Sequence, residues 1–147
     1  MLTLPTDSEE RKEIPLYSGC LAYFPAALAG VARHSFKGNQ KHNPGQTLHH
    51  ARGKSMDHKD CILRHLVDLG DLERASQVDR DAALAEADAI CWRALALSQE
   101  LHEKFGAPLA PSARLPQDEP ISSAESPREI TVEGDEIPGS PYAACEE

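Results

Sequence analysis

Three stretches of the chain carry apolar residues at the spacing of an α-helix, where positions three and four apart share one face. They run from Pro25 to about residue 37, from about residue 55 to 69, and from about residue 80 to 105. Ser55 and Asp79 precede the second and third stretches, and their side-chain oxygens suit a helix N-cap. A glycine follows each pattern. The sequence therefore predicts an all-α fold, a small bundle of about three main helices.

Two aspartates interrupt the apolar faces of the second and third predicted helices. Asp60 falls in a row made of Met56, Leu63 and Val67. Asp88 falls in a longer row made of Leu84, Ala87, Cys91, Ala94, Leu95, Ser98 and Leu101. An ionised carboxylate is too costly to bury alone, so each needs an ion pair, a proton or a bound cation. If these two faces pack against each other, Asp60 and Asp88 meet across the core.

Further acids lie close to both positions. Asp57 and Arg64 lie one turn before and after Asp60 on the same helix edge, and Asp81 lies two turns before Asp88. Several carboxylates at one place require neutralisation, and hard oxygen ligands suit Mg²⁺ or Mn²⁺. We therefore expect Asp57, Asp60 and Asp88 to be catalytic residues and metal ligands, with Asp81 as a fourth ligand. The alternative for Asp57 is a simple interaction with the helix dipole.

The connection between the first two helices, residues 38–54, reads GNQKHNPGQTLHHARGK and is rich in polar and basic residues. Long connections of this kind are often functional loops, and their glycines let a ligand approach the backbone. We expect Asn43, Arg52 and Lys54 to bind the phosphates of a substrate, together with Arg64 and His65 of the second helix. A solvated loop is an equally ordinary interpretation of this composition.

For three side chains of the second and third helices, a structural role is the more usual interpretation. His65 lies on the row of His58 and Ile62, where a hydrogen-bonded packing role is more usual than a ligand role. Glu86 falls on a different side of the third helix from Asp88, and we expect it to be solvated. Trp92 is expected to anchor packing, with base stacking as the less usual role.

The negative charge of the protein is concentrated near its C-terminus. The net charge is −9, but residues 107–147 hold nine acids against two arginines, which leaves −2 for residues 1–106. This segment also contains seven of the eleven prolines. We expect it to be disordered, because it cannot bury enough apolar area to offset ordering entropy. The predicted organisation is a flexible lead-in at 1–13, a helical domain at 14–106 and an acidic tail at 107–147.

Composition also bears on compartment and on partners. The four cysteines form no CxxC pair, so neither a structural zinc site nor a disulfide framework is indicated. No secretory signal or membrane span is evident, and the expected location is cytoplasmic. The helical part is near neutral and lacks a broad basic face, which disfavours nucleic-acid binding.

Three motifs carry a resemblance to a known family: GNxxHNPG at 38–45, KSxDHxDCxxRHL at 54–66 and WRALAL at 92–97. Over residues 13–104 the chain resembles the phage and bacterial domain called the dATP/dGTP diphosphohydrolase N-terminal domain. That group is related to the MazG-like, all-α nucleoside triphosphate pyrophosphohydrolases. The resemblance implies an oligomeric, Mg²⁺-dependent enzyme that converts a purine deoxynucleoside triphosphate to the monophosphate and pyrophosphate, in the host cytoplasm if phage-encoded.

The wider MazG pattern has ExxE on one helix and ExxD on the next. Asp57 and Asp60 correspond to the first pair and Asp88 to the last acid, whereas Ala85 stands at the remaining acidic position. Asp81 or Glu86 would have to supply the fourth ligand, or the site binds fewer metal ions. Two non-enzymatic functions stay open beside the hydrolase: a catalytically silent helical interaction module, and a protein that binds nucleotide without hydrolysis. Three helices in so short a domain make a thin core, so we expect a homo-oligomer.

Overall fold

The fold is helical, as the sequence predicts, and the computed structural model describes residues 2–115. In chain order the elements are α1 (Ser8–Lys12), a single π-helical turn η1 (Tyr17–Leu21), α2 (Pro25–His42), β1 (His50–Ala51), α3 (His58–Arg74), α4 (Arg80–Lys104) and β2 (Ala113–Arg114). The two strands pair in parallel over two residues each. The predicted disordered tail lies outside the described residues from 116 onward. Its first part, 107–115, is described and carries β2.

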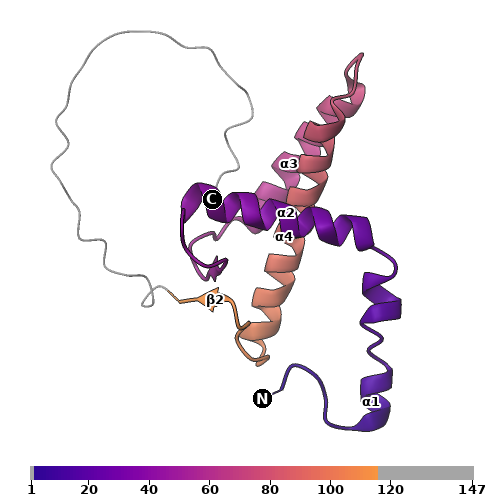
Figure 1. Ribbon diagram of the computed structural model, residues 1–147, viewed down its shortest axis with the longest axis vertical. Coiled ribbons are helices and arrows are strands. Elements are labelled where there is room, and N and C mark those ends of the chain that lie inside the picture. Colours follow the sequence, from indigo (N-terminus) through magenta and orange to yellow (C-terminus); the bar gives the residue numbers. More distant parts are fainter. Residues whose placement is uncertain (1, 116–147) are drawn as a thin grey trace, which may run out of the picture.

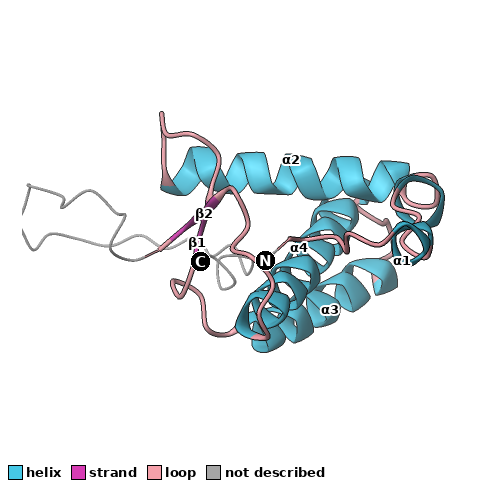
Figure 2. Cartoon of the chain, turned by 90° about the horizontal axis from the view of Figure 1, so that it is seen from below, coloured by secondary structure: helices cyan, strands magenta, loops and turns pink. Residues whose placement is uncertain are grey.

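Helix α4 organises the other long helices. α3 and α4 lie side by side as a hairpin, and α2 crosses α4 on another side (Figures 1 and 2). Two of the three buried residues of α4 are small, Ala89 and Ala96; the third is Arg93. Small side chains at a contact shorten the distance between helix axes. As a result, α4 can pack closely against both neighbours.

Two of the three long helices, α2 and α3, have bounds that differ clearly from those predicted. α4 begins where expected, and the Asp79 side chain accepts hydrogen bonds from the backbone amides of Asp81 and Ala82, each at 3.0 Å. α2 continues to His42, five residues further than predicted. α3 begins after Asp57 and continues through Gly70. A glycine inside a helix costs only about 1 kcal/mol, which packing against α4 offsets.

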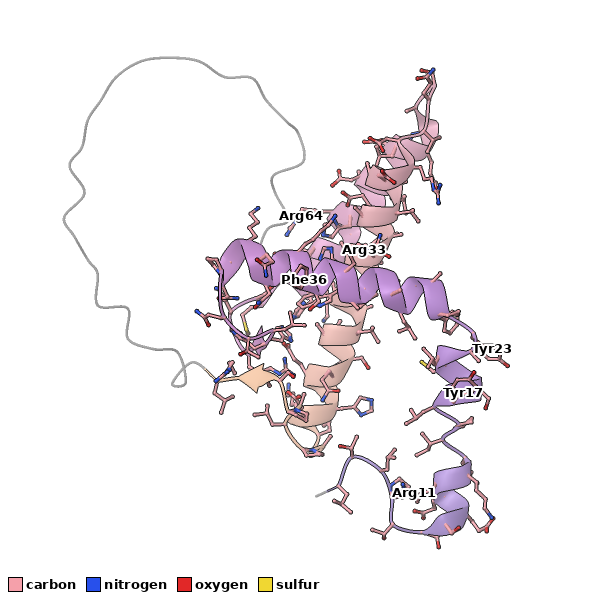
Figure 3. The ribbon with its side chains drawn as sticks, viewed as in Figure 1. Arg11, Tyr17, Tyr23, Arg33, Phe36 and Arg64 are labelled. Atoms are coloured by element: carbon pink, nitrogen blue, oxygen red, sulfur yellow. The ribbon has the colours of Figure 1, made fainter. Side chains whose placement is uncertain are left out.

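The N-terminal segment is more structured than the predicted flexible lead-in. Asp7 caps α1 by accepting hydrogen bonds from the backbone amides of Glu9 and Glu10, at 2.9 and 3.0 Å. α1 and η1 form an arm that projects from the long helices, and Tyr17 and Tyr23 on it are exposed (Figures 1 and 3). Among the described residues, no single helix is long and apolar enough to cross a membrane. Residues 8–21 and 25–42, bent by 82°, pass that test as a pair.

The predicted buried faces of the second and third helices are wrong. Leu63 of α3 is 61% exposed and Leu95 of α4 is 52% exposed, and most of their predicted rows are exposed with them. The helices instead pack through a different row, which contains the buried His58 and Cys61. Across the described residues, the buried hydrophobic side chains are limited to Cys61, Leu72, Ala89 and Ala96. One chain therefore leaves an apolar face on α3 and another on α4 without a partner from its own fold.

The crossing of α2 over α4 depends on Gly30. A Cβ atom at this position would lie 2.0 Å from Asp88 Oδ1 and 2.5 Å from Asp88 Cγ, far inside van der Waals contact. We predict that Gly30→Ala lowers the free energy of unfolding by about 1–3 kcal/mol, because the helices must separate or Asp88 must move. Urea denaturation measures the change.

The matched control is Gly38→Ala in the same helix. A Cβ at Gly38 would meet nothing within 4 Å. There alanine should be neutral or should stabilise by up to about 1 kcal/mol through its higher helix propensity. Equal stability of the two variants would contradict the close approach at Gly30.

Candidate functional site

A pocket of about 360 Å³ opens between the C-terminal half of α2, the segment 49–55 and the middle of α4. We call it the basic pocket. Its lining includes four cationic side chains, Lys37, Lys41, Lys54 and Arg93. It also includes two amides and four imidazoles, namely Asn39, Asn43, His34, His42, His49 and His50. No carboxylate is among the lining residues, so the pocket is suited to an anion.

Trp92 and Arg93 form the wall of the basic pocket that α4 supplies. Arg93 is only 5% exposed, and its Nη1 donates a hydrogen bond to Ser55 Oγ at 2.6 Å. Its guanidinium carbon lies 5.5 Å from the Trp92 ring centroid. The rings of His34 and His50 also approach Trp92, with centroids at 6.2 and 5.0 Å. A fixed guanidinium beside an indole provides a phosphate ligand next to a stacking surface.

The end of α2 is held by two asparagines of the GNxxHN motif. Asn39 is buried, and its Nδ2 donates a hydrogen bond to the Gln46 carbonyl oxygen at 3.1 Å. Asn43 Nδ2 in turn donates to Asn39 Oδ1 at 3.5 Å. These bonds fix the turn that follows α2, which lies beside the basic pocket. Asn39 has a structural role that the sequence analysis did not assign.

Only part of the predicted phosphate-binding set reaches the basic pocket. Asn43 and Lys54 line it. Arg52 does not line the pocket and is paired with Glu103. Its Nε and Nη2 donate hydrogen bonds to the two Glu103 carboxylate oxygens at 2.7 and 2.8 Å. The hydrogen bond from Arg52 lowers the pKa of Glu103 to about 2. Arg64 donates to Asp57 at 2.7 Å on the exposed surface of α3.

A first group of metal-capable side chains, the His50 cluster, consists of His50, His58 and Glu100. Nε2 of His50 and Nε2 of His58 lie 3.8 and 3.4 Å from Glu100 Oε1. His58 is 4% exposed, and its Nδ1 has no hydrogen-bond partner among the described residues. Such a buried unpaired group costs about 1–3 kcal/mol. The sequence analysis assigned no role to this cluster.

His50 is predicted to titrate far below an ordinary histidine. Burial, and then the neighbouring Arg52 guanidinium, lower its pKa from 6.5 to about 4. The unfolded chain then binds more protons than the folded chain between these values. This contribution to stability is complete above pH 6.5 and is lost as the pH falls toward 4. An NMR titration of the imidazole C–H signals checks this, with Arg52→Gln expected to raise the value; a midpoint near 6.5 in the wild type would contradict it.

A second group, the His65 cluster, joins α3 to α4 through His65, Asp68 and Glu86. His65 Nδ1 lies 2.6 Å from Glu86 Oε2, and both side chains are mostly buried. Ligand atoms of all three residues lie within 4.8 Å of one another. The expectation that Glu86 is solvated is therefore wrong. His65, predicted to bind substrate, is instead paired with a carboxylate on the next helix.

The four predicted metal ligands do not come together within the chain. Asp57 lies at the N-cap of α3 and is exposed; hydrogen bonds from Arg64, Cys61 and Ser55 lower its pKa to about 2. Asp60 lies in the first turn of α3 and is exposed, so its predicted burial is wrong. In the part of the chain that is described, none of the four acids belongs to a metal-capable group.

The other two predicted ligands lie on α4. Asp81 is exposed in the first turn of that helix. Asp88 is half-buried against Gly30 of α2. It also lies near His34, where its charge opposes the larger effect of burial, which lowers the His34 pKa. Asp88 is thus a packing residue between α2 and α4 in the single chain.

Comparisons with known proteins add no name to this geometry. No family model, no curated protein and no solved structure matches the chain. The fold and pocket define a small helical protein with a basic pocket that Trp92 helps to line. Its family stays a prediction from the three sequence motifs.

Proposed function

We propose that the basic pocket binds a purine deoxynucleoside triphosphate and that the protein hydrolyses it to the monophosphate and pyrophosphate. The observation that carries the proposal is the position of Trp92 beside Arg93 in a pocket whose other cations are lysines. A nucleotide combines a flat base with a chain of phosphates, and this wall offers a partner for each. The resemblance of residues 13–104 to dATP/dGTP diphosphohydrolases supplies the reaction and the purine preference.

The size and charge of the pocket support this assignment. Its volume of about 360 Å³ falls in the range of small-molecule sites. Lys37 and Lys54 have ammonium groups on flexible stems, while Arg93 is fixed by Ser55. A fixed guanidinium can hold a phosphate through two parallel hydrogen bonds, and the lysines neutralise the remaining charge. Stacking on Trp92 accepts either purine, which agrees with a substrate class of two bases.

The resemblance also implies Mg²⁺, so the question is which side chains of the chain could bind that ion. The predicted ligands Asp57, Asp60, Asp81 and Asp88 do not converge within the chain, so no step is assigned to them. The His65 cluster offers two carboxylates and one imidazole from adjacent helices, which fits Mn²⁺ better than Mg²⁺. When bound, such an ion polarises a phosphoryl oxygen and activates water.

The test is product analysis with each deoxynucleoside and ribonucleoside triphosphate, in Mg²⁺ and in Mn²⁺. We expect pyrophosphate and monophosphate, with no orthophosphate, and with dATP and dGTP as the best substrates. Trp92→Ala should raise KM for both purines. Absence of pyrophosphate from every nucleotide, with the wild-type chain folded, would remove the hydrolase proposal.

A second function is favoured by one observation, the separation of the predicted catalytic acids. A protein that binds nucleotide without hydrolysing it needs the basic pocket and no metal-activated water. In that case calorimetry would detect nucleotide binding while the product assay stays blank. The two measurements together separate an enzyme from a nucleotide-binding module.

We also propose that the chain self-associates through the exposed apolar faces of α3 and α4. The support is the exposure of Leu63, Val67 and Leu95 in a chain whose described buried apolar residues number only four. Covering such side chains by a second copy contributes about 1.5–3 kcal/mol for each one fully buried. Light scattering should give a multiple of 16.0 kDa for the wild type and a smaller mass for Leu63→Glu. A monomeric wild type would contradict the proposal.

A further inference from the structure

We propose that His65, Asp68 and Glu86 bind a divalent metal ion of the Mn²⁺ kind. The site differs from the one that the sequence predicts, because Asp68 is outside the expected ligand set and Glu86 enters that set only as an alternative to Asp81. This inference adds a metal site to the proposed function. Only the role of the ion in nucleotide hydrolysis rests on that function. Metal binding itself requires no nucleotide.

The backbone already places the three donors together. His65 and Asp68 are three residues apart on α3, so their side chains share one face of that helix. Glu86 reaches them from α4, with its Oε2 2.6 Å from His65 Nδ1. Ligand atoms of the three lie within 4.8 Å of one another. Donors on a metal at about 2.0–2.2 Å lie up to about 4.4 Å apart, so small side-chain adjustments are enough.

The charges around the His65 cluster favour a cation. The Glu86 side chain is mostly buried and Asp68 is half-buried, and no described lysine or arginine lies within ion-pair distance of either carboxylate. Asp68 has no hydrogen bond or ion pair to any described residue, and Glu86 pairs with His65 alone. Two carboxylates removed from much of the solvent leave negative charge that one imidazole offsets only if it is protonated. A divalent ion would neutralise both.

The His50 cluster is the competing site, and its surroundings oppose a cation. It has one carboxylate, from Glu100, and the Arg52 guanidinium donates a hydrogen bond to His50 Nδ1. A neutral His50 that accepts there carries its proton on Nε2, the nitrogen that faces Glu100. Both the extra positive charge and this tautomer disfavour metal binding at His50. The His65 cluster has neither obstacle.

The inferred metal site borders the basic pocket through His34. This residue lines the pocket. Burial is the main cause that lowers its pKa, and the charges of His65 and Glu86 act on it more weakly. None of the three cluster residues lines the pocket itself. His34 is thus the pocket residue whose pKa responds to the charges of the His65 cluster.

The experiment titrates the full chain with Mn²⁺ in the absence of nucleotide and measures free Mn²⁺ by its electron paramagnetic resonance signal. We expect the wild type to bind one ion per chain in addition to weak binding by the acidic segment after residue 106. Asp68→Asn and Glu86→Gln should each weaken the specific site at least tenfold. Asp60→Asn is the matched control, since it makes the same change on the same helix and should bind as the wild type does. Circular dichroism verifies that each variant is folded.

Three outcomes would overturn the inference: no specific Mn²⁺ site in the wild type, equal weakening by Asp60→Asn and Asp68→Asn, or a loss caused instead by Glu100→Gln. The second would restore the ligand set predicted from the sequence, and the third would place the ion at the His50 cluster. Failure of the proposed function gives a different pattern. In that case Mn²⁺ binds and depends on Asp68, while no nucleotide is hydrolysed.

Discussion

Replacing Glu103 by glutamine should lower the free energy of unfolding by about 3–5 kcal/mol, the range measured when one partner of a buried ion pair is removed. The Glu103 carboxylate accepts two hydrogen bonds from Arg52, one from Gln99 Nε2 and one from the backbone amide of Ala110. Its side chain and that of Arg52 are 11% and 10% exposed. One carboxylate thus fastens the loop before α3 and the segment after α4 to the same helix.

The same contact makes stability depend on pH. Because the folded pKa of Glu103 is about 2 and its ordinary value is 4.5, the unfolded chain binds more protons between these values. The stabilisation is complete above pH 4.5 and is lost as the pH falls toward 2. Urea denaturation at pH 7 and pH 3 should show a smaller loss in Glu103→Gln than in the wild type. Glu73→Gln, an exposed change on α3, should follow the wild type; an unchanged pH dependence in Glu103→Gln would contradict this account.

Arg93→Gln should raise the Kd for a purine nucleotide by about 10-fold to 100-fold, since a hydrogen bond to a charged group contributes about 1.5–3 kcal/mol. Arg93 is the one pocket cation that is buried, and Ser55 and Trp92 fix its direction. Arg93→Lys should recover only part of the affinity, because an ammonium cannot hold phosphate through two parallel bonds.

Two comparisons keep the Arg93 result interpretable. Arg80→Gln removes the same charge from the exposed start of α4 and should leave the Kd unchanged. Urea denaturation shows whether Arg93→Gln remains folded under the conditions of the titration. An affinity unchanged in a folded Arg93→Gln protein would show that nucleotide does not use this wall of the pocket.

The sequence predicts that the long helices form, but it does not predict which of their faces are buried. Asp79 as an N-cap is a local signal, and it locates the start of α4 correctly. Which face of α3 is buried depends on α4, where Ala89 and Ala96 allow close approach. The larger apolar residues Leu63 and Leu95 are left outside. Selecting the most apolar face therefore identifies the side that remains exposed in one chain.

The same limit applies to the candidate site, because some of its residues are held by partners far away in the sequence. Asn43 and Lys54, predicted to bind substrate, both line the basic pocket. Arg52 belongs to the same segment, but Glu103, 51 residues away, holds it. His65 and Asp68 have a visible signal, the spacing of three on a helix. That spacing indicates a metal site only if Glu86 lies opposite, and the packing of α3 against α4 decides whether it does.

The most direct test of nucleotide binding is calorimetric titration of the full chain with dGTP and dATP, in the wild type and in a Lys37→Ala, Lys54→Ala double variant. We predict wild-type binding that weakens with added salt, and a Kd at least about tenfold higher in the double variant. Lys59→Ala, a change on α3 outside the pocket, should bind as the wild type does. No binding by the folded wild type, or equal affinity in the wild type and the double variant, would contradict the account.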